Sequence, residues 1–178
     1  MPPKSLTHLE IEFAAPQWRK LRGLKPRLNK AAEAALSHLP KALQPLARAS
    51  SFTLLLTTDS AVKKLNSDWR GKNKPTNVLS FPQFTPTELK KLKPSKGAKS
   101  PKIYLGDIAI SYRYVVDEAK KEDKKLLDHA THLMIHGILH IFGYDHATAA
   151  QAVQMEKLEK KVMASLGLPD PYAINNHK

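Results

Sequence analysis

The stretch HGILHIFGYDH, residues 136–146, decides how the rest of this chain is interpreted. His136 and His140 are four residues apart, so on a helix their rings share one face and can bind one metal ion. Gly143 is expected to end that helix, because glycine readily adopts the left-handed conformation found at helix ends. The reversal would bring His146 back toward the same ion.

Three neutral imidazoles without a fourth protein ligand describe an open site, which can hold a water and make it a nucleophile near neutral pH. Five of the eight histidines fall between His129 and His146, which favours a metal site over ordinary core or surface histidines. His132 is also four residues from His136, but the helical rise places it about 12 Å from His140. Because metal–nitrogen bonds are only about 2.1 Å long, His132 and His140 cannot ligate one ion together. His132 is therefore expected to support a ligand, face the substrate or serve the structure.

The bulk composition bounds the class of protein. The 178 residues suit one compact domain, residues 1–178, with a core large enough to fold without disulfides or a structural metal. There is no cysteine, which excludes disulfides and thiolate zinc sites and is compatible with a reducing cytoplasm. No apolar run approaches the roughly 20 residues of a membrane span, and the first residues do not resemble a signal peptide. We expect a cytoplasmic protein without a membrane partner.

The charge is strongly unbalanced. Lys and Arg number 29 against 16 Asp and Glu, giving a net charge of +13. This excess favours a polyanionic partner, most simply nucleic acid, while the alternative is a basic charge that only aids solubility. Residues 85–102 are rich in proline and lysine and predict a mobile basic loop with a helical turn at 87–92. Its candidate RNA-binding residues are Lys90, Lys91, Lys93 and Lys96.

Apolar patterns predict an α/β (α+β) fold. Strands are expected at residues 5–13, 51–57, 77–81 and 103–110. The longer helices are expected at residues 25–39, 60–70, 112–121, 126–142 and from 149 to about 166. The prediction is a small four-stranded mixed sheet packed with helices around a central metal-binding helix, with a frayed tail at about 173–178.

Connections and caps are predicted more locally. Strand, helix and strand within residues 51–81 suggest a right-handed parallel crossover. Asp59 and Ser111 are expected to cap the helices that follow them. Thr148 and Gln151 form a capping-box pattern at the start of the last helix.

A zinc-protease helix with this histidine spacing reads His-Glu-x-x-His, and its glutamate is the general base. Here Gly137 occupies the position of that glutamate, which weakens a protease interpretation. Gly137 is instead expected to permit the close approach of another element to the helix.

Three separated stretches resemble the YbeY family of metal-dependent endoribonucleases. They are HLMIHGILHIFGYDH at 132–146, WRGKNKPTNVLSFP at 69–82 and LGDI at 105–108. The resemblance covers roughly residues 54–172 and implies one Zn²⁺ at His136, His140 and His146, with Arg70 acting on substrate phosphate. The sequence departs from the family at Asn77, where Asp is commoner, and in its longer lysine-rich stretch.

The resemblance also implies a function. It implies a single-strand-specific endoribonuclease in maturation of the 16S rRNA 3′ end and in ribosome quality control. The implied partners are ribosomal RNA, the small ribosomal subunit and its assembly factors. Two alternatives stay open: a metalloprotease-like hydrolase, and a ribosome assembly factor whose metal is structural. The physiological metal, the attacking nucleophile and the oligomeric state are left open, since imidazole suits several divalent ions.

The residues fit this chemistry on their own terms. RNA cleavage needs an activated oxygen and positive charge on the phosphate, which a three-histidine metal and the planar fork of Arg70 can supply. A surface salt bridge is the alternative for Arg70. Asp145 could either hydrogen-bond a ligand ring or cap its turn, and Asp107 is interpreted as structural. The remaining candidates for substrate or RNA contact are Lys72, Lys74, Thr76 and Ser80.

Overall fold

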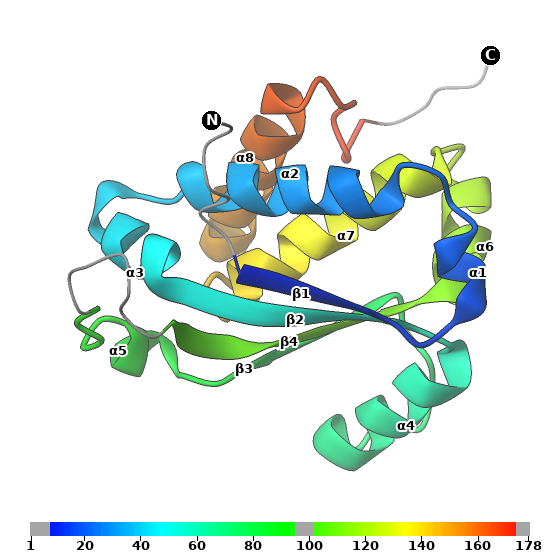
Figure 1. The fold of residues 1–178 in the computed structure, drawn as a ribbon, viewed down its shortest axis with the longest axis horizontal. Coiled ribbons are helices and arrows are strands. Elements are labelled where there is room, and N and C mark those ends of the chain that lie inside the picture. The colour runs from blue at the N-terminus through cyan, green and yellow to red at the C-terminus, as the bar shows by residue number, and fades with distance from the viewer. Residues whose placement is uncertain (1–7, 95–101, 174–178) are drawn as a thin grey trace.

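The structure is a computed structural model that describes residues 8–94 and 102–173 (Figure 1). The described residues form a four-stranded sheet with the order β1-β2-β4-β3. Its strands are β1 (His8–Phe13), β2 (Ser50–Thr57), β3 (Val78–Pro82) and β4 (Ile103–Ser111). β1, β2 and β4 are parallel, whereas β3 is antiparallel to β4. The predicted mixed sheet is therefore confirmed.

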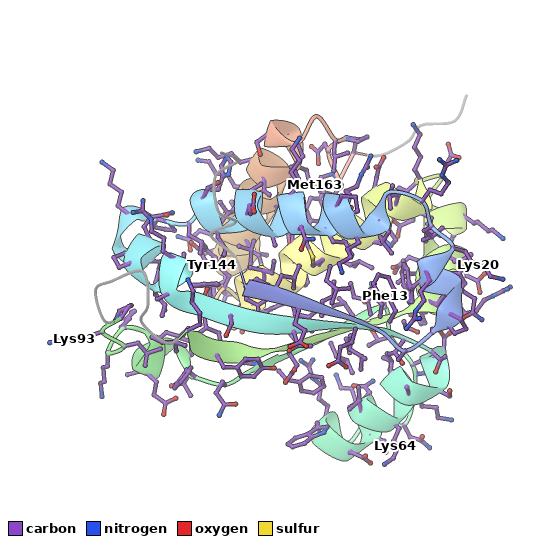
Figure 2. The ribbon with its side chains drawn as sticks, in the orientation of Figure 1. Phe13, Lys20, Lys64, Lys93, Tyr144 and Met163 are labelled. Atoms are coloured by element: carbon purple, nitrogen blue, oxygen red, sulfur yellow. The ribbon has the colours of Figure 1, made fainter. Side chains whose placement is uncertain are left out.

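Helices lie on both faces of this sheet. α2 (Leu24–Ser37), α7 (Leu126–Ile141) and α8 (Ala149–Ser165) lie on one side, and α4 (Asp59–Arg70) lies on the other (Figure 1). The shorter helices are α1 (Pro16–Arg19), η1 (Lys41–Leu43), α3 (Gln44–Ala49), α5 (Pro86–Leu89) and α6 (Tyr112–Lys121). The side chains fill the space between the sheet and the α2–α7–α8 layer (Figure 2).

The predicted parallel crossover is wrong. β4, and not β3, pairs with β2, and β3 lies antiparallel at the edge of the sheet. The backbone of β3 is suited to that edge, because Asn77 and Gln83 bond across to β4. Because successive residues of a strand direct their backbone groups to opposite sides, the backbone nitrogen of Pro82 faces away from β4. Its lack of an N–H therefore removes no hydrogen bond from the sheet.

The predicted cap at Asp59 is wrong, whereas Ser111 is the N-cap residue of α6 as predicted, although its side chain accepts no hydrogen bond from that helix. The Thr58 side chain, and not Asp59, accepts from the first turn of α4. Asp59 instead accepts from the backbone N–H groups of Arg113 and Tyr114, at 3.0 and 3.1 Å, and from the Ser111 hydroxyl. An anionic side chain is favourable at a helix N-terminus, so Asp59 stabilises the start of α6 across the sheet end.

α7 is the central helix of the fold and packs against β3, β4, α2, α6 and α8. Gly137 allows this approach, since a Cβ there would lie 2.8 Å from Cγ2 of the buried Ile108 in β4. The predicted close approach at Gly137 is confirmed. Gly143 has a φ of 85° just after the helix, and the predicted capping box of Thr148 and Gln151 opens α8.

The predicted basic loop is partly structured. α5 begins with a capping box made by Thr85 and Glu88, which accounts for the expected helical turn. Residues 95–101 of this loop, and 174–178 of the expected tail, lie outside the described residues. The single domain stays a prediction. Within residues 8–94 and 102–173, no helix is both long and apolar enough to cross a membrane.

Gly106 carries the backbone through an irregular step in β4. Its φ is 140°, and a Cβ would lie 2.2 Å from the carbonyl oxygen of Phe81. We expect Gly106→Ala to lower the free energy of unfolding by about 2–4 kcal/mol, through backbone strain plus a clash that no side-chain rotation relieves. Gly167→Ala is the matched control. Gly167 also has a positive φ, 69°, but a Cβ there would meet no atom within 4 Å, so the substitution adds backbone strain alone. Urea unfolding would compare them; equal losses would contradict the clash.

Candidate metal centre

His136, His140 and His146 converge at the C-terminal end of α7. One ligand atom from each ring lies within 4.8 Å of the others. The Nε2 atoms of His136 and His140 are 3.0 Å apart, and the His146 ring stacks against His136 with centroids 5.5 Å apart. α7 supplies two of these rings, and the chain reversal at Gly143 returns the third.

The hydrogen bonds on the far side of two rings fix which nitrogen faces the site. His140 Nδ1 lies 2.9 Å from the carbonyl oxygen of Tyr144, which only accepts, so Nδ1 carries the hydrogen. His136 Nδ1 lies 2.5 Å from Oε1 of Glu159 and donates to that carboxylate. In neutral rings the two Nε2 atoms then present lone pairs to each other, an arrangement that a shared cation makes favourable. The donor set therefore fits a metal ion.

Burial keeps His140 neutral. Burial lowers the pKa of His140 to about 4, and the neighbouring rings of His136 and His146 act in the same direction. A neutral imidazole is the form that binds a metal ion. Protons therefore compete less with a cation at His140 than they would at an exposed histidine.

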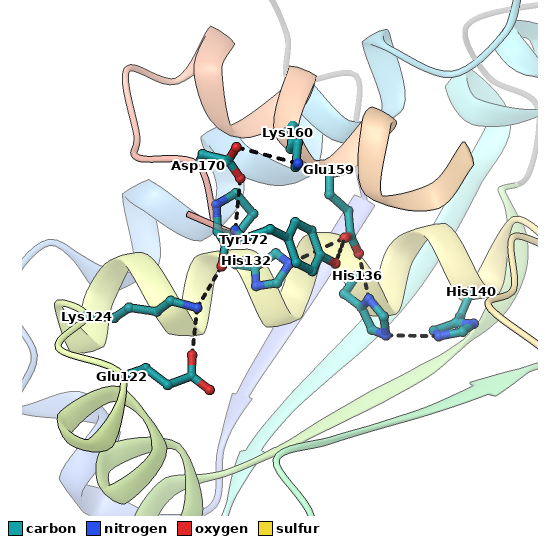
Figure 3. A network of polar contacts seen from close by, with 10 residues as sticks. Glu122, Lys124, His132, His136, His140, Glu159, Lys160, Asp170 and Tyr172 are labelled. Carbon is teal, nitrogen blue, oxygen red and sulfur yellow. Dashed lines mark hydrogen bonds and ion pairs between the residues drawn. The ribbon is translucent and has the colours of Figure 1, made fainter. Parts of the chain in front are cut away.

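Glu159 of α8 is the group that sequence reasoning missed. Its side chain is fully buried, with Oε1 at His136, while Oε2 accepts from the Tyr172 hydroxyl (Figure 3). His132 Nε2 lies 3.4 Å from the same Oε2. Although burial alone would raise the pKa of Glu159, the His132 and His136 rings beside it lower that pKa to about 2. The ionised carboxylate thus orients His136, as a carboxylate behind a ligand histidine does in metal sites.

A signal for Glu159 was present in the sequence. In the sequence of the last helix, the spacing of Met155, Leu158, Val162 and Leu166 predicts one apolar face. The residues that α8 buries are Met155, Glu159, Val162 and Met163. Glu159 comes four residues after Met155 and three before Val162, so on a helix it lies on the buried face. A charged side chain is stable in such a place only when it is paired.

Tyr172 comes from the segment after α8 and completes this network. Burial, followed by the hydrogen bond to Glu159, raises the pKa of Tyr172, so its hydroxyl stays a donor at neutral pH. Its ring lies edge-on to His132, with centroids 5.4 Å apart. The Asp170 carboxylate accepts from the Tyr172 backbone, and Lys124 donates to the carbonyl just before it, at 2.8 and 2.7 Å (Figure 3).

The other helix histidines lie outside the three-ligand group. His132 is buried and faces Glu159, one turn before the converging rings. His129 Nε2 lies 2.7 Å from a carboxylate oxygen of Glu118, which also accepts from the amide of Asn77 at 2.9 Å. An aspartate in place of Asn77 could not donate that bond, which suits the amide found here.

Arg70 ends α4, on the sheet face opposite α7 (Figure 1). Its Nη2 donates to the carbonyl oxygen of Ser80 at 3.1 Å. Ser80 alternates with the residues of β3 that bond to β4, so this carbonyl faces the open edge of the sheet. Within the described residues, no hydrogen bond or ion pair joins Arg70 to the histidines. The guanidinium is therefore anchored at the rim between the two faces.

The remaining sequence candidates are placed as follows. Asp145 accepts from the backbone N–H of His146 at 2.8 Å and so caps its own turn. The Thr76 hydroxyl donates weakly to Asn77, at 3.4 Å, and the Ser80 side chain is buried. Asp107 accepts from the Tyr104 hydroxyl, a structural contact. Exposed lysines include Lys72, Lys74, Lys90, Lys91 and Lys93, and Lys96 lies outside the described residues.

A cavity of ≈ 540 Å³ lies beside the turn that follows α7. The turn after α7 lines it through Tyr144 and Asp145, and the α5 segment lines it through Pro86, Leu89 and Lys90. The two walls are in contact, since the site of a Cβ on Gly143 lies 3.3 Å from Pro86. The basic α5 segment therefore borders the turn that carries His146.

Comparisons with known proteins agree with this architecture. The fold and the converging histidines define an α/β protein with a candidate three-histidine metal centre. A family model described as Endoribonuclease YbeY matches residues 16–167. The chain belongs to the YbeY endoribonuclease family.

Individual relatives cover nearly the whole chain. Endoribonuclease YbeY of Bartonella quintana is 40% identical over 165 residues, which are 93% of this chain and 96% of that protein. Endoribonuclease YbeY of Nitrobacter hamburgensis is 41% identical over 172 residues, 95% of this chain and 84% of that protein. The solution structure of TM1509 from Thermotoga maritima is 20% identical, with a TM-score of 0.53 over 96% of this chain and 99% of that one. This last likeness shows the fold.

The Glu159 contact can be tested through metal affinity. We expect Glu159→Gln to weaken Zn²⁺ binding about 10- to 100-fold, because the buried anion that orients His136 is lost. Tyr172→Phe should weaken it less, since the carboxylate stays in place. Glu156→Gln, one turn away on α8, is the matched control. Competition with a chromogenic chelator would measure affinity, with circular dichroism as the check of folding. Wild-type affinity in a folded Glu159→Gln protein would contradict the assignment.

Proposed function

We propose that this chain is a metal-dependent endoribonuclease that cleaves single-stranded RNA. The observation that carries the proposal is the convergence of His136, His140 and His146 in a chain of the YbeY endoribonuclease family. These three residues would hold one Zn²⁺, the ion that commonly combines three protein ligands with an open position. When bound, such an ion supplies Lewis-acid stabilisation of phosphate charge and lowers the pKa of water toward neutrality.

The chain's own residues have distinct tasks in this proposal. Glu159 and the Tyr144 carbonyl hold the two helix rings with their Nε2 atoms toward the ion. Arg70 would bind the reacting phosphate, because a guanidinium has five N–H donors and the Ser80 carbonyl uses one. Lys90, which lines the cavity, and the exposed Lys91 and Lys93 that follow it would bind backbone phosphates without reading bases.

We propose ribosomal RNA as the substrate, with maturation of the 16S rRNA 3′ end and ribosome quality control as the roles. The support is the family membership together with a net charge of +13, which suits a polyanionic partner. The small ribosomal subunit and its assembly factors would be the partners. Such a substrate would place the protein in the cytoplasm.

Cleavage assays test the activity against its alternatives. Protein purified without a nickel column would be analysed for metal, then incubated with single-stranded RNA, duplex RNA and casein, with and without a chelator. We expect cleavage of single-stranded RNA that the chelator stops and Zn²⁺ restores. Cleavage of casein would instead support a metalloprotease-like hydrolase. Bound metal without any cleavage would support an assembly factor whose metal is structural.

The ligand assignment predicts different results for two neighbouring histidines. His140→Ala should lose most bound metal, because two histidines and two waters bind a metal ion weakly. His132→Ala should keep its metal, since the His132 ring faces Glu159 and lies outside the converging group. Metal analysis of both purified variants decides the question. Equal metal loss in the two variants would mean that the wrong helix pair was chosen.

The role of Arg70 predicts a loss of rate without a loss of metal. Arg70→Lys keeps the charge but removes the planar fork, so cleavage of single-stranded RNA should slow on the order of a hundredfold. Metal content and melting temperature should stay near wild type. Arg113→Lys is the matched control, since Arg113 is exposed and pairs with Asp117 on α6. An unchanged cleavage rate in Arg70→Lys would show that Arg70 has no role in catalysis and only a structural one, its hydrogen bond to the Ser80 carbonyl.

A further inference from the structure

The C-terminal end of α4 carries an exposed tryptophan among cations. The Trp69 side chain is 72% exposed, and Arg70, Lys72 and Lys74 beside it are exposed as well. No ion pair within the described residues neutralises these three cations. Aromatic rings that alternate with basic side chains are typical of single-stranded nucleic-acid sites, where bases stack and phosphates pair.

This Trp69 cluster, residues 69–74, has a fixed place on the fold. The Trp69 ring packs edge-on against Phe81 of β3, with centroids 6.2 Å apart. The side chain of the buried Asn66 donates to the Lys74 carbonyl at 2.8 Å, and the Lys72 backbone donates to the Asn66 carbonyl at 3.1 Å. The ring is therefore packed on the sheet, and the backbone that carries the two lysines is held in place before any ligand binds.

The cluster lies where a strand could pass to the metal centre. Arg70 is bonded to the outward carbonyl of Ser80, at the open edge of β3. α7, with His136 and His140, packs against the other face of the same strand (Figure 1). A single-stranded chain crossing this edge would meet the Trp69 cluster on one face and the histidines on the other.

We propose that Trp69 stacks on an unpaired base of the RNA substrate while Lys72 and Lys74 bind its phosphates. The inference rests on the proposed function and deepens it, because it assigns part of the selectivity for single strands to this residue. Every base has a flat face that an indole can cover, so the contact tolerates any sequence. A duplex hides those faces within its own base stack and could offer the cluster only phosphates.

Intrinsic fluorescence tests the stacking contact directly. The chain has two tryptophans, and Trp18 is fully buried with its indole N–H bonded to the Thr57 carbonyl. The solvent-exposed component of the emission therefore comes from Trp69. We expect an oligouridylate of about twelve nucleotides to quench that component, and a blunt RNA duplex of equal length to leave it unchanged. Emission is read in the first seconds after mixing with metal-loaded protein, and a gel confirms that the RNA is intact.

Variants separate stacking from charge. Trp69→Phe should leave only the Trp18 emission, without a response to RNA. Trp69→Leu should weaken oligouridylate binding roughly five- to a hundredfold with no change in salt dependence, because stacking releases no counterions. The double variant Lys72→Gln/Lys74→Gln should lower the slope of log affinity against log salt by about 1.4. Tyr114→Leu is the control, since Tyr114 is an exposed aromatic on α6.

The outcomes are decisive and separate from those of the cleavage assay. Saturating RNA that leaves the Trp69 emission unchanged, or wild-type affinity in Trp69→Leu, would overturn the stacking contact. If wild-type protein still cleaved RNA in that case, the proposed function would stand and only the role of Trp69 would fall. An absence of RNA cleavage with quenching intact would instead count against the proposed function alone.

Discussion

The buried contact between Glu159 and His136 is the constraint on which the rest of the site depends. A carboxylate without solvent is stable only when it is paired, and here both of its oxygens have partners. That requirement ties α8 to α7 and draws Tyr172 over the same carboxylate (Figure 3). The need to pair one charge behind the converging rings therefore helps to fix the last helix and the segment after it, together with the apolar residues that α8 buries.

α7 can place its histidines because the helix packs closely against the sheet. Gly137 removes the side chain that would separate the helix from β4, and Gly143 reverses the chain without strain. The Tyr144 carbonyl, just past that reversal, then holds the His140 ring. The chain reversal at Gly143 and the Tyr144 carbonyl thus orient the His140 ring, and burial keeps that ring neutral.

The sequence predicts what depends on local periodicity. The four-residue spacing of His136 and His140, the glycine stop and the strand and helix positions all follow from repeats within one segment. What it could not predict depends on distant partners. Asp59 bonds to Ser111, the N-cap of α6, which is 52 residues away, and Glu159 stands among polar residues in the sequence of an amphipathic helix. The edge position of β3 also requires knowing that β4 pairs with β2.

The open edge of β3 joins the two halves of the proposed RNA path. Exposed strand edges invite pairing with other chains, and proteins block them with proline and charge. Here Pro82 has no N–H to offer and Arg70 occupies the Ser80 carbonyl, so neither position can pair with another strand. The groups that close it leave cationic donors at the rim between α4 and α7. An edge that rejects a β-strand but presents positive charge is suited to a polyanionic chain, which needs no ladder partners. In the proposed function, the same residues would hinder strand pairing at this edge and would give an RNA strand a route from one face to the other.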